Sequence, residues 1–400
     1  MQGYVPRSIQ AQVEARLADF PVVAVLGPRQ CGKTTLVREA IESRPGVVYL
    51  DLERPSDLGK LRDPELFFNL HRSQGNASLF CLDEIQRVPE IFPLLRSLVD
   101  EERTNGQFLL LGSASRELLR QTSETLAGRI TYLELTPFLA SELPGEDPAV
   151  LPRLWLRGGF PPSFLATREA SSNVWRESFV RTFLERDLPQ LGFNVPAATL
   201  HRLWRMLAHS HGQTLNSSQL GVSLGVSHTS IRSYLDLLTQ TFMVRLLEPF
   251  ATNTKKRLVK SPKVYLRDSG ILHSLLQIDA LDDLLAHPVC GPSWEGLVIE
   301  NLVATLPEWQ PSFYRTVEGA EIDLVLERGR RRLAFECKAS TAPAVSRGFW
   351  TALEDLGIGE AWVVAPVTEP YPIREGVMVT PLRALLDLLG SREHYRQEES

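Results

Sequence analysis

The stretch VVAVLGPRQCGKTTL, residues 22–36, decides the fold of the amino-terminal part of this 400-residue chain. Its first five residues are apolar and mostly β-branched, which predicts a buried strand. The pattern G-x-x-x-x-G-K-T follows at once, and its glycines allow backbone N–H groups to close around phosphate oxygens at the start of a helix. The stretch therefore predicts a strand, a phosphate-binding loop and a helix in succession.

The loop residues predict that ATP and Mg²⁺ bind here. Lys33 is expected to reach the β- and γ-phosphates, and the Thr34 hydroxyl to hold Mg²⁺. The alternative is an ordinary glycine-rich turn, but the strand before it and the Lys-Thr pair after it favour a nucleotide site. The predicted nucleotide-binding residues are Gly27, Pro28, Arg29, Gln30, Cys31, Gly32, Lys33, Thr34 and Thr35.

Working outward, apolar runs at 47–50 and 79–82 predict two more strands, and the second ends in Asp83-Glu84. Asp83 is expected to face the metal ion, and Glu84 to orient and deprotonate the attacking water. An aspartate at a strand end can also cap the next helix, so this assignment depends on the loop upstream.

A further apolar strand at 108–111 is followed by Gly-Ser at 112–113. Ser113 is predicted to be a polar sensor beside the γ-phosphate, with a helix cap as the alternative. Strands that alternate with helical stretches predict a parallel, doubly wound sheet whose ligands lie at the carboxyl ends of the strands.

Two arginines are candidates to neutralise charge on the transferred phosphoryl group. Arg129, just before a strand at 130–133, could act within its own chain or on a neighbouring subunit, which would imply a homo-oligomer. The alternative is a surface arginine without a role in catalysis. Arg29, inside the loop, is a second candidate for the same task.

Length and composition predict two to three globular domains, since domains average about 150 residues. The formal net charge is −5, so contact with nucleic acid requires a local basic patch. No apolar run approaches the length of a membrane span, and the first 20 residues lack a signal-peptide core. We therefore expect a cytoplasmic protein without membrane contact.

The rest of the chain is expected to form three further segments after the ATPase core at 1–145. Frequent Pro and Gly at 144–162 mark the end of that core, and residues 146–195 are predicted to be a helical connector. Residues 196–262 predict a winged helix, with a helix-turn-helix pattern at 217–238 and wing strands at 242–247 and 263–266.

The expected winged helix carries the local basic patch. Short polar side chains begin its second helix, and residues 255–263 hold five positive charges. Such side chains predict sequence-tolerant, salt-sensitive DNA binding. The alternative is a winged helix that contacts protein or forms an ATPase lid. The predicted DNA-binding residues are Ser227, His228, Thr229, Arg232, Lys255, Lys256, Arg257 and Lys260.

In the last segment, 263–400, residues 322–337 predict a hairpin with an arginine-rich turn. Glu336 and Lys338 are two residues apart and therefore share one face of a strand. If Asp323 lies on that face of the partner strand, two carboxylates can bind Mg²⁺ beside an ammonium. Glu295 of the preceding helix fits best as a third acidic residue, with Glu300 as the alternative.

The motifs at 27–35, 83–84 and 112–113 resemble those of bacterial and archaeal AAA-type P-loop ATPases that carry a conserved C-terminal domain. YVPR at 4–7 and LAGR at 126–129 are similar too. The resemblance covers nearly the whole chain, because GAEID at 319–323 and FECK at 335–338 resemble the D…E-x-K arrangement of PD-(D/E)XK nucleases. It implies a DNA-associated ATPase with a nuclease-like tail.

The expected fold is α/β, with a doubly wound parallel-sheet P-loop NTPase core, a winged-helix domain and a restriction-endonuclease-like α/β C-terminal domain. The expected function is Mg²⁺-dependent ATP hydrolysis coupled to DNA processing or remodelling, with branched repair or recombination intermediates as candidate substrates. Two alternatives stay open: a nucleotide-switched regulatory ATPase with an inactive nuclease-like docking domain, and an ATP-regulated DNA endonuclease.

Overall fold

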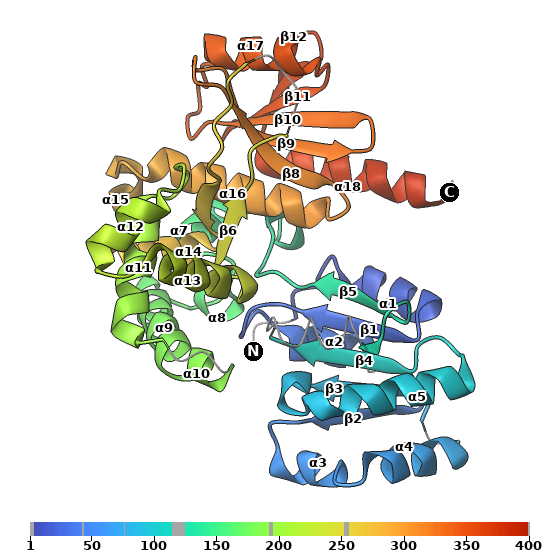
Figure 1. The fold of residues 1–400 in the computed structure, drawn as a ribbon. Helices are drawn as coiled ribbons and strands as arrows, with labels where there is room; N and C mark the ends of the chain where they lie inside the picture. Colours follow the sequence, from blue (N-terminus) through green and yellow to red (C-terminus); the bar gives the residue numbers. More distant parts are fainter. Residues whose placement is uncertain are drawn as a thin grey trace. The chain divides into compact units, whose positions relative to one another are not determined.

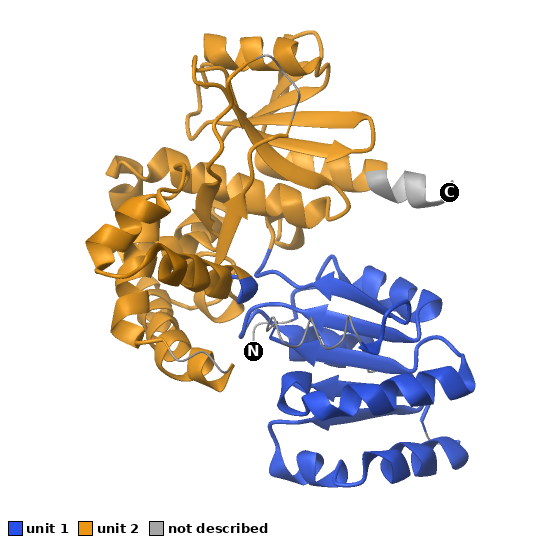
Figure 2. Ribbon diagram, viewed as in Figure 1, with its two compact units in different colours: residues 1–138, 240–242 blue, residues 139–239, 243–400 orange. Residues whose placement is uncertain are grey.

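The computed structural model describes residues 4–41, 44–75, 77–113, 125–191, 195–251 and 256–398. The chain divides into two compact units (Figure 2). Unit 1 comprises Met1–Phe138 and Gln240–Phe242, and unit 2 comprises Leu139–Thr239 and Met243–Ser400. Within the described ranges, no helix is long and apolar enough to cross a bilayer.

Unit 1 contains a sheet of five parallel strands in the order β2-β3-β4-β1-β5. Every residue of β1, β3 and β4 is buried, as expected for inner strands that are covered on both faces. The strands are β1 (Val22–Leu26), β2 (Val47–Asp51), β3 (Leu79–Asp83), β4 (Phe108–Gly112) and β5 (Ile130–Glu134).

Helices connect these parallel strands, and α5 runs across the near face of the sheet in Figure 1. The prediction of an α/β core with a parallel sheet is therefore confirmed. The helical segments are α1 (Gln10–Asp19), α2 (Lys33–Ile41), α3 (Pro55–Lys60), α4 (Pro64–Ser73), η1 (Ile85–Arg87), η2 (Pro89–Ile91) and α5 (Phe92–Glu102).

Unit 2 begins with a group of helices followed by a pair of antiparallel strands. Gly225, with φ of +68°, ends α12 and allows the tight turn into α13. The segments are η3 (Ala140–Glu142), α7 (Val150–Arg157), α8 (Pro161–Phe164), α9 (Glu169–Thr182), the π-helical turn η4 (Phe183–Asp187), α10 (Leu188–Gln190), α11 (Ala197–His209), α12 (Ser217–Leu224), α13 (His228–Gln240), β6 (Val244–Leu247) and β7 (Lys263–Leu266).

The remainder of unit 2 is a six-stranded mixed sheet in the order β12-β13-β11-β10-β9-β8, with helices before, within and after it. The predicted hairpin is present, since β9 and β10 pair antiparallel on either side of Gly329. The elements are α14 (Ser269–Leu276), α15 (Leu281–Ala286), α16 (Cys290–Thr305), β8 (Gln310–Arg315), β9 (Glu321–Arg328), β10 (Arg331–Cys337), α17 (Arg347–Leu356), β11 (Ala361–Val364), β12 (Tyr371–Arg374), β13 (Val377–Thr380) and α18 (Leu382–Glu398).

The connection between β6 and β7 contacts the C-terminal sheet, which the sequence did not predict. Pro249 forms a bridge with Phe313 of β8, and Leu258 forms one with Thr316. In addition, β7 begins at Lys263 and pairs with β6. The predicted domain boundary at 262/263 falls between these two bonded strands, and the division of residues 146–400 stays a prediction.

Candidate functional site

The phosphate loop begins where β1 ends, and its shape depends on glycine. The backbone N–H of Leu135 donates to the carbonyl oxygen of Leu26 at 2.7 Å, which brings the chain after β5 against the loop. A Cβ atom on Gly27 would lie 2.2 Å from the Leu135 oxygen, so only glycine fits. Gln30 and Gly32 have φ of +63° and +102°, and they turn the chain into α2.

Lys33, the first residue of α2, is buried and points back into the loop. Its ammonium donates to the carbonyl oxygens of Gly27 and Pro28, both at 2.9 Å. The ammonium thus lies among the loop residues at the amino end of a helix, which is the environment that attracts phosphate.

Asp83, at the carboxyl end of β3, accepts two hydrogen bonds on one oxygen. The hydroxyl groups of Thr34 and Tyr49 each donate to Asp83 Oδ2 at 2.6 Å. Asp83 Oδ1 is buried and has no hydrogen-bond partner among the described residues. A carboxylate oxygen without a partner beside a threonine hydroxyl matches the oxygen ligands that Mg²⁺ prefers, so these residues fit the expected ion.

Glu84 follows Asp83 and adopts a left-handed conformation, with φ of +60° and ψ of +45°. The side-chain amide of Gln86 donates to the Glu84 carboxylate and, at 3.1 Å, to Ser113 Oγ. Burial raises the pKa of the Glu84 carboxyl, while Lys33 and Arg29 oppose this shift. Gln86 therefore connects the two polar residues that follow β3 and β4.

Arg129 does not lie at this edge of the sheet. Its carbonyl oxygen accepts from the N–H of Val22, at the amino end of β1, whereas the phosphate loop follows the carboxyl end. Its guanidinium instead donates to both carboxylate oxygens of Asp100, at 2.6 and 3.0 Å. The prediction that Arg129 acts on phosphate within its own chain is therefore wrong, and action on a neighbouring subunit stays a prediction.

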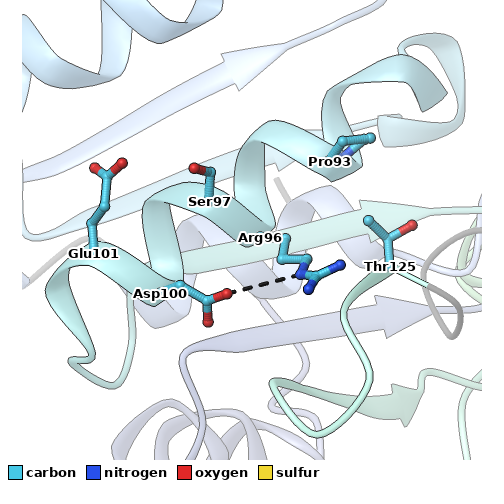
Figure 3. A pocket seen from close by; sticks show the side chains of 6 residues that line it. All are labelled: Pro93, Arg96, Ser97, Asp100, Glu101 and Thr125. Carbon is cyan, nitrogen blue, oxygen red and sulfur yellow. Dashed lines mark ion pairs between the residues drawn. The ribbon is translucent and has the colours of Figure 1, made fainter.

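The same Asp100 lies in the wall of a cavity of about 460 Å³ along α5 (Figure 3). Arg96 faces it there, with 3.8 Å between Nε and the carboxylate. Arg29 is better placed than Arg129, because it lies in the phosphate loop itself, between β1 and α2. Arg29 also forms an ion pair with Glu53 at 3.0 Å.

Sequence reasoning missed three side chains that shape the loop edge: Tyr49, Gln86 and Arg7. Arg7 is buried and donates to the carbonyl oxygen of Cys31 in the loop at 3.0 Å, and to that of Thr136 at 2.6 Å. It thereby connects the loop to the segment after β5. The YVPR motif at 4–7 was the available sequence signal for Arg7, whereas no local pattern marks Tyr49 or Gln86.

In unit 2, the predicted DNA-binding residues of the helix pair are exposed at the start of α13. Ser227 Oγ accepts from the N–H of Ser230 at 3.1 Å, so this side chain caps the helix. His228, Thr229 and Arg232 lie in the first turns of α13 and are exposed.

The basic segment before β7 is only partly available. Lys255 lies outside the described residues. The ammonium of Lys256 donates to both oxygens of Asp355 on α17, at 2.6 and 2.7 Å. Lys256, one of the predicted DNA-binding residues, is therefore paired with a carboxylate of its own chain. Arg257 and Lys260 are exposed.

The predicted nuclease-like residues lie near one another at the open end of the β9–β10 hairpin, where β9 begins and β10 ends. The Lys338 ammonium donates to Glu336 Oε1 at 2.7 Å, and the backbone N–H of Cys337 donates to Asp323 Oδ2 at 2.9 Å. Burial and the charge of Asp323 raise the pKa of Glu336 to about 8 and that of Glu295 to about 7. These shifts show that the carboxyl groups of Asp323, Glu295 and Glu336 influence one another.

Two observations limit this site as a metal centre. In the part of the chain that the structure describes, no group of three His, Cys, Asp or Glu side chains is arranged to hold a metal ion. Instead, the Lys263 ammonium lies 3.1 Å from Glu295 Oε1 and 3.6 Å from Asp323 Oδ1. An internal cation therefore contacts two of the predicted ligands.

Glu300, the alternative third acidic residue, forms a different contact. Its carboxylate pairs with Arg245 of β6 and, at 2.9 Å, with Arg267. Burial would raise its pKa, but the two guanidinium groups hold it at about 2. Glu300 therefore joins structural elements, and Glu295 is the residue that lies near Asp323.

Comparison with known proteins assigns the chain to a family. Residues 19–143 match a family described as an AAA domain, and residues 149–282 and 290–385 match two families described as domains of unknown function, DUF8612 and DUF4143. A Walker-type ATPase of Pyrococcus abyssi is 14% identical to the chain, covering 68% of it and 96% of that structure, with a TM-score of 0.47.

Two uncharacterised proteins, one of Mycobacterium tuberculosis and one of Mycobacterium bovis, are each 43% identical to the chain over 380 residues. The match covers 95% of this chain and 84% of each relative. The chain therefore belongs to the same family as these mycobacterial proteins, and its AAA domain makes it a P-loop ATPase.

Proposed function

We propose that this P-loop ATPase hydrolyses ATP with Mg²⁺ and couples the reaction to work on DNA. The observation that supports the first part most strongly is the contact between Thr34 and Asp83. The hydroxyl after the loop lysine and the carboxylate at the end of β3 lie 2.6 Å apart, and the other carboxylate oxygen has no partner in the part of the chain that the structure describes. Chain segments 49 residues apart thus meet at one edge of the sheet.

Each residue of this edge has a task in hydrolysis. Thr34 and Asp83 would hold Mg²⁺, which neutralises charge on the β- and γ-phosphates when it is bound. Lys33 must release the carbonyl oxygens of Gly27 and Pro28 to reach the phosphates. Glu84 orients the attacking water and accepts its proton.

Two further side chains support this assignment: Gln86 holds the Glu84 carboxylate, and Arg29 supplies positive charge. Gln86 fixes the Glu84 carboxylate from one side, and its second hydrogen bond reaches Ser113, the proposed sensor of the γ-phosphate. Arg29 supplies positive charge near Glu84 from within the loop. Arg29 is therefore the residue of this chain that we assign to charge neutralisation.

The DNA-binding part of the proposal rests on exposed side chains of unit 2. His228, Thr229 and Arg232 extend from the amino end of α13, where helix dipole and side chains both suit a phosphate backbone. Arg257 and Lys260 add positive charge. Contacts of these side chains with phosphate carry no sequence information and release counterions, so binding should be sequence-tolerant and weaken as salt rises.

The test is ATP turnover of the full chain with and without duplex, forked and four-way DNA at low salt. Glu84→Gln should lower turnover about 100-fold or more, because it removes the proton acceptor. Glu90→Gln, an identical change at an exposed residue of η2, should leave turnover unchanged. Retained turnover in Glu84→Gln would contradict the assigned site.

DNA should stimulate the wild-type ATPase, and its binding should weaken in Arg232→Gln/Lys260→Gln. Loss of two phosphate contacts should reduce the slope of log K against log salt by about 2. Arg62→Gln, which removes an exposed arginine of unit 1, is the matched control. If no DNA form binds or stimulates at low salt, the coupling to DNA is refuted while the ATPase assignment stands.

One observation favours a second function, a nucleotide-switched regulatory ATPase whose C-terminal region only docks. The Lys263 ammonium contacts the carboxylates that an endonuclease would need for its metal ion. Incubating labelled DNA with wild type and Glu336→Ala separates these alternatives. Cutting that is lost in Glu336→Ala would establish the ATP-regulated endonuclease, and absence of cutting in both would support a docking role.

A further inference from the structure

We propose that the Lys263 ammonium is a built-in cation that occupies the carboxylate cluster of unit 2 and excludes a divalent metal ion from it. The carboxylate cluster consists of Glu295 on α16 and of Glu321 and Asp323 on β9. This proposal is independent of the nucleotide site, since it concerns side chains of unit 2 alone.

The geometry around Lys263 Nζ is that of an enclosed cation. Nζ lies 3.0 Å from Glu321 Oε1, 3.1 Å from Glu295 Oε1 and 3.6 Å from Asp323 Oδ1. The ring centroid of Phe313 lies 5.5 Å from Nζ. The side chain is only 3% exposed, so three carboxylates and a ring face take the place of water.

Strand geometry explains why this lysine reaches the cluster. Lys263 and Tyr265 are two residues apart on β7 and share one face of the strand. Tyr265 also contacts the cluster, because its hydroxyl donates to the same Glu295 oxygen. Glu321 and Asp323 are likewise two apart on β9. Strands β7 and β9 therefore each contribute two side chains to the group around Lys263 Nζ and Glu295.

Carboxylate attraction keeps Lys263 charged. Burial alone would lower the pKa of its ammonium, but Glu295, Asp323 and Glu321 reverse this, and the pKa is raised. A divalent ion at the same carboxylates would be repelled by the ammonium. It would also need oxygen atoms at about 2.1 Å, about 1 Å closer than the oxygens around Nζ.

A further carboxylate oxygen that could bind a divalent ion is nevertheless present beside the carboxylate cluster. Glu336 is 5% exposed, and its Oε2 is buried without a hydrogen-bond partner among the described residues. The backbone N–H of the next residue, Cys337, donates to Asp323 Oδ2 at 2.9 Å, which places Glu336 beside Asp323. Glu336 itself pairs with the Lys338 ammonium at 2.7 Å. Without the Lys263 ammonium, Glu295 and Asp323 would lose their cationic partner, and a divalent ion could take its place.

The test compares Mn²⁺ binding to the nucleotide-free full chain by electron paramagnetic resonance. Lys263→Met keeps the length of the side chain and removes its charge, and it should bind one more Mn²⁺ per chain than wild type. Lys256→Met is the matched control, because Lys256 pairs with Asp355 outside the cluster. It should bind as wild type does. Any Mn²⁺ held by the nucleotide site is common to all three proteins.

The added ion should depend on the cluster, so Lys263→Met/Glu295→Gln should lose it. Thermal unfolding is a second measurement. At a hundredfold excess over the dissociation constant, Mn²⁺ should raise the Tm of Lys263→Met by about 5 °C more than that of wild type. A folded Lys263→Met that neither gains an ion nor is stabilised by Mn²⁺ would overturn the proposal.

Wild type itself provides a test that does not depend on folding of the lysine variant. If wild-type protein binds a Mn²⁺ that Glu295→Gln or Asp323→Asn removes, then the ammonium does not exclude the metal and the proposal is wrong. If neither substitution changes the Mn²⁺ count of wild type, the exclusion is supported even where Lys263→Met fails to fold.

Discussion

A single carboxylate oxygen, Asp83 Oδ2, accepts hydrogen bonds from Thr34 and Tyr49. These two donors fix the plane of the carboxylate, and Oδ1 has no hydrogen-bond partner within the described ranges. Burial and the hydrogen bond to Asp83 raise the pKa of the Tyr49 phenol, so Tyr49 acts as a neutral donor at any ordinary pH. Tyr49 is therefore a positioning residue for the expected Mg²⁺ ligand.

Tyr49→Phe should raise the Mg²⁺ concentration needed for half-maximal ATP turnover by about tenfold, because a ligand that loses its orienting partner binds metal more weakly. The kcat at saturating Mg²⁺ should change little, since Glu84 and Lys33 are untouched. The measurement is a Mg²⁺ titration at fixed ATP. Tyr371→Phe, at an exposed strand of unit 2, is the control. An unchanged Mg²⁺ requirement in Tyr49→Phe would refute the positioning role.

Single residues differ in how far their positions could be predicted. Lys33, Thr34 and Asp83 follow from local patterns, since a loop motif and a strand end both point to the same edge of a parallel sheet. Tyr49 and Gln86 come from a strand interior and a short helical turn, where no local rule assigns a direction. Arg129 shows the reverse error, because a residue just before a parallel strand lies at its amino end, opposite to the edge where the phosphate loop follows β1.

At the scale of elements, α7 and α14 approach so closely that one glycine is required. A Cβ atom on Gly270, the second residue of α14, would lie 2.0 Å from the carbonyl oxygen of Arg157. The buried carboxylate of Asp268 caps α14 by accepting from the N–H of Ile271 at 2.9 Å, and accepts from Gly159 at 2.8 Å. The junction of these helices therefore depends on backbone contacts.

Gly270→Ala should lower the free energy of unfolding of unit 2 by about 3 kcal/mol, because the backbone must move to relieve the overlap. Gly291→Ala is a matched control, since Gly291 is also the second residue of a helix, α16, and a Cβ there would meet no atom within 4 Å. It should stabilise by about 0.5 kcal/mol. Urea unfolding measures both, and equal stabilities would contradict the close approach.

Elements with a strong pattern of their own were predictable, including the β9–β10 hairpin and the alternation of strands and helices in unit 1. The contacts of residues 248–251 and 256–262 were not. The basic residues of this segment predict a DNA-binding patch, yet Pro249 and Leu258 form bridges with Phe313 and Thr316, and Lys256 pairs with α17. A sequence pattern reports charge, whereas the partner of a charge is set by tertiary contacts.

For the molecule as a whole, tryptophan distinguishes the two units. All seven tryptophans lie in unit 2, so their fluorescence follows the unfolding of unit 2 alone. The same unit contains buried ionisable groups with opposite pKa shifts. Burial lowers the pKa of His273 to about 3 and that of His211 to about 4, whereas the pKa of Glu336 is raised to about 8.

The hydrogen bonds of His273 explain its neutral state. Nδ1 lies 3.0 Å from the carbonyl oxygen of Leu156, which can only accept, and Nε2 lies 2.8 Å from Ser293 Oγ. Trp155 donates to the same Oγ at 2.9 Å, so the serine hydroxyl is left to donate to Nε2. Protonation of Nε2 would disrupt this chain of bonds within the core.

Linkage then predicts opposite pH dependences for two variants. The folded pKa of His273 lies below its unfolded value of about 6.5, so His273 costs stability as pH falls from 6.5 towards 3. The folded pKa of Glu336 lies above its unfolded value of about 4.3, so Glu336 adds stability as pH falls from 8 towards 4. Between pH 6.5 and 4.5 the two effects oppose each other in wild type.

Relative to wild type, His273→Gln should therefore gain about 1.4 kcal/mol of unfolding free energy for each pH unit of acidification between 6.5 and 4.5, and Glu336→Gln should lose about as much. Urea unfolding monitored by tryptophan fluorescence at pH 6.5, 5.5 and 4.5 measures both slopes. His228→Gln, at an exposed histidine, should run parallel to wild type. If the unfolding free energies of His273→Gln and Glu336→Gln also ran parallel to that of wild type across this pH range, neither buried group would change its proton affinity on folding.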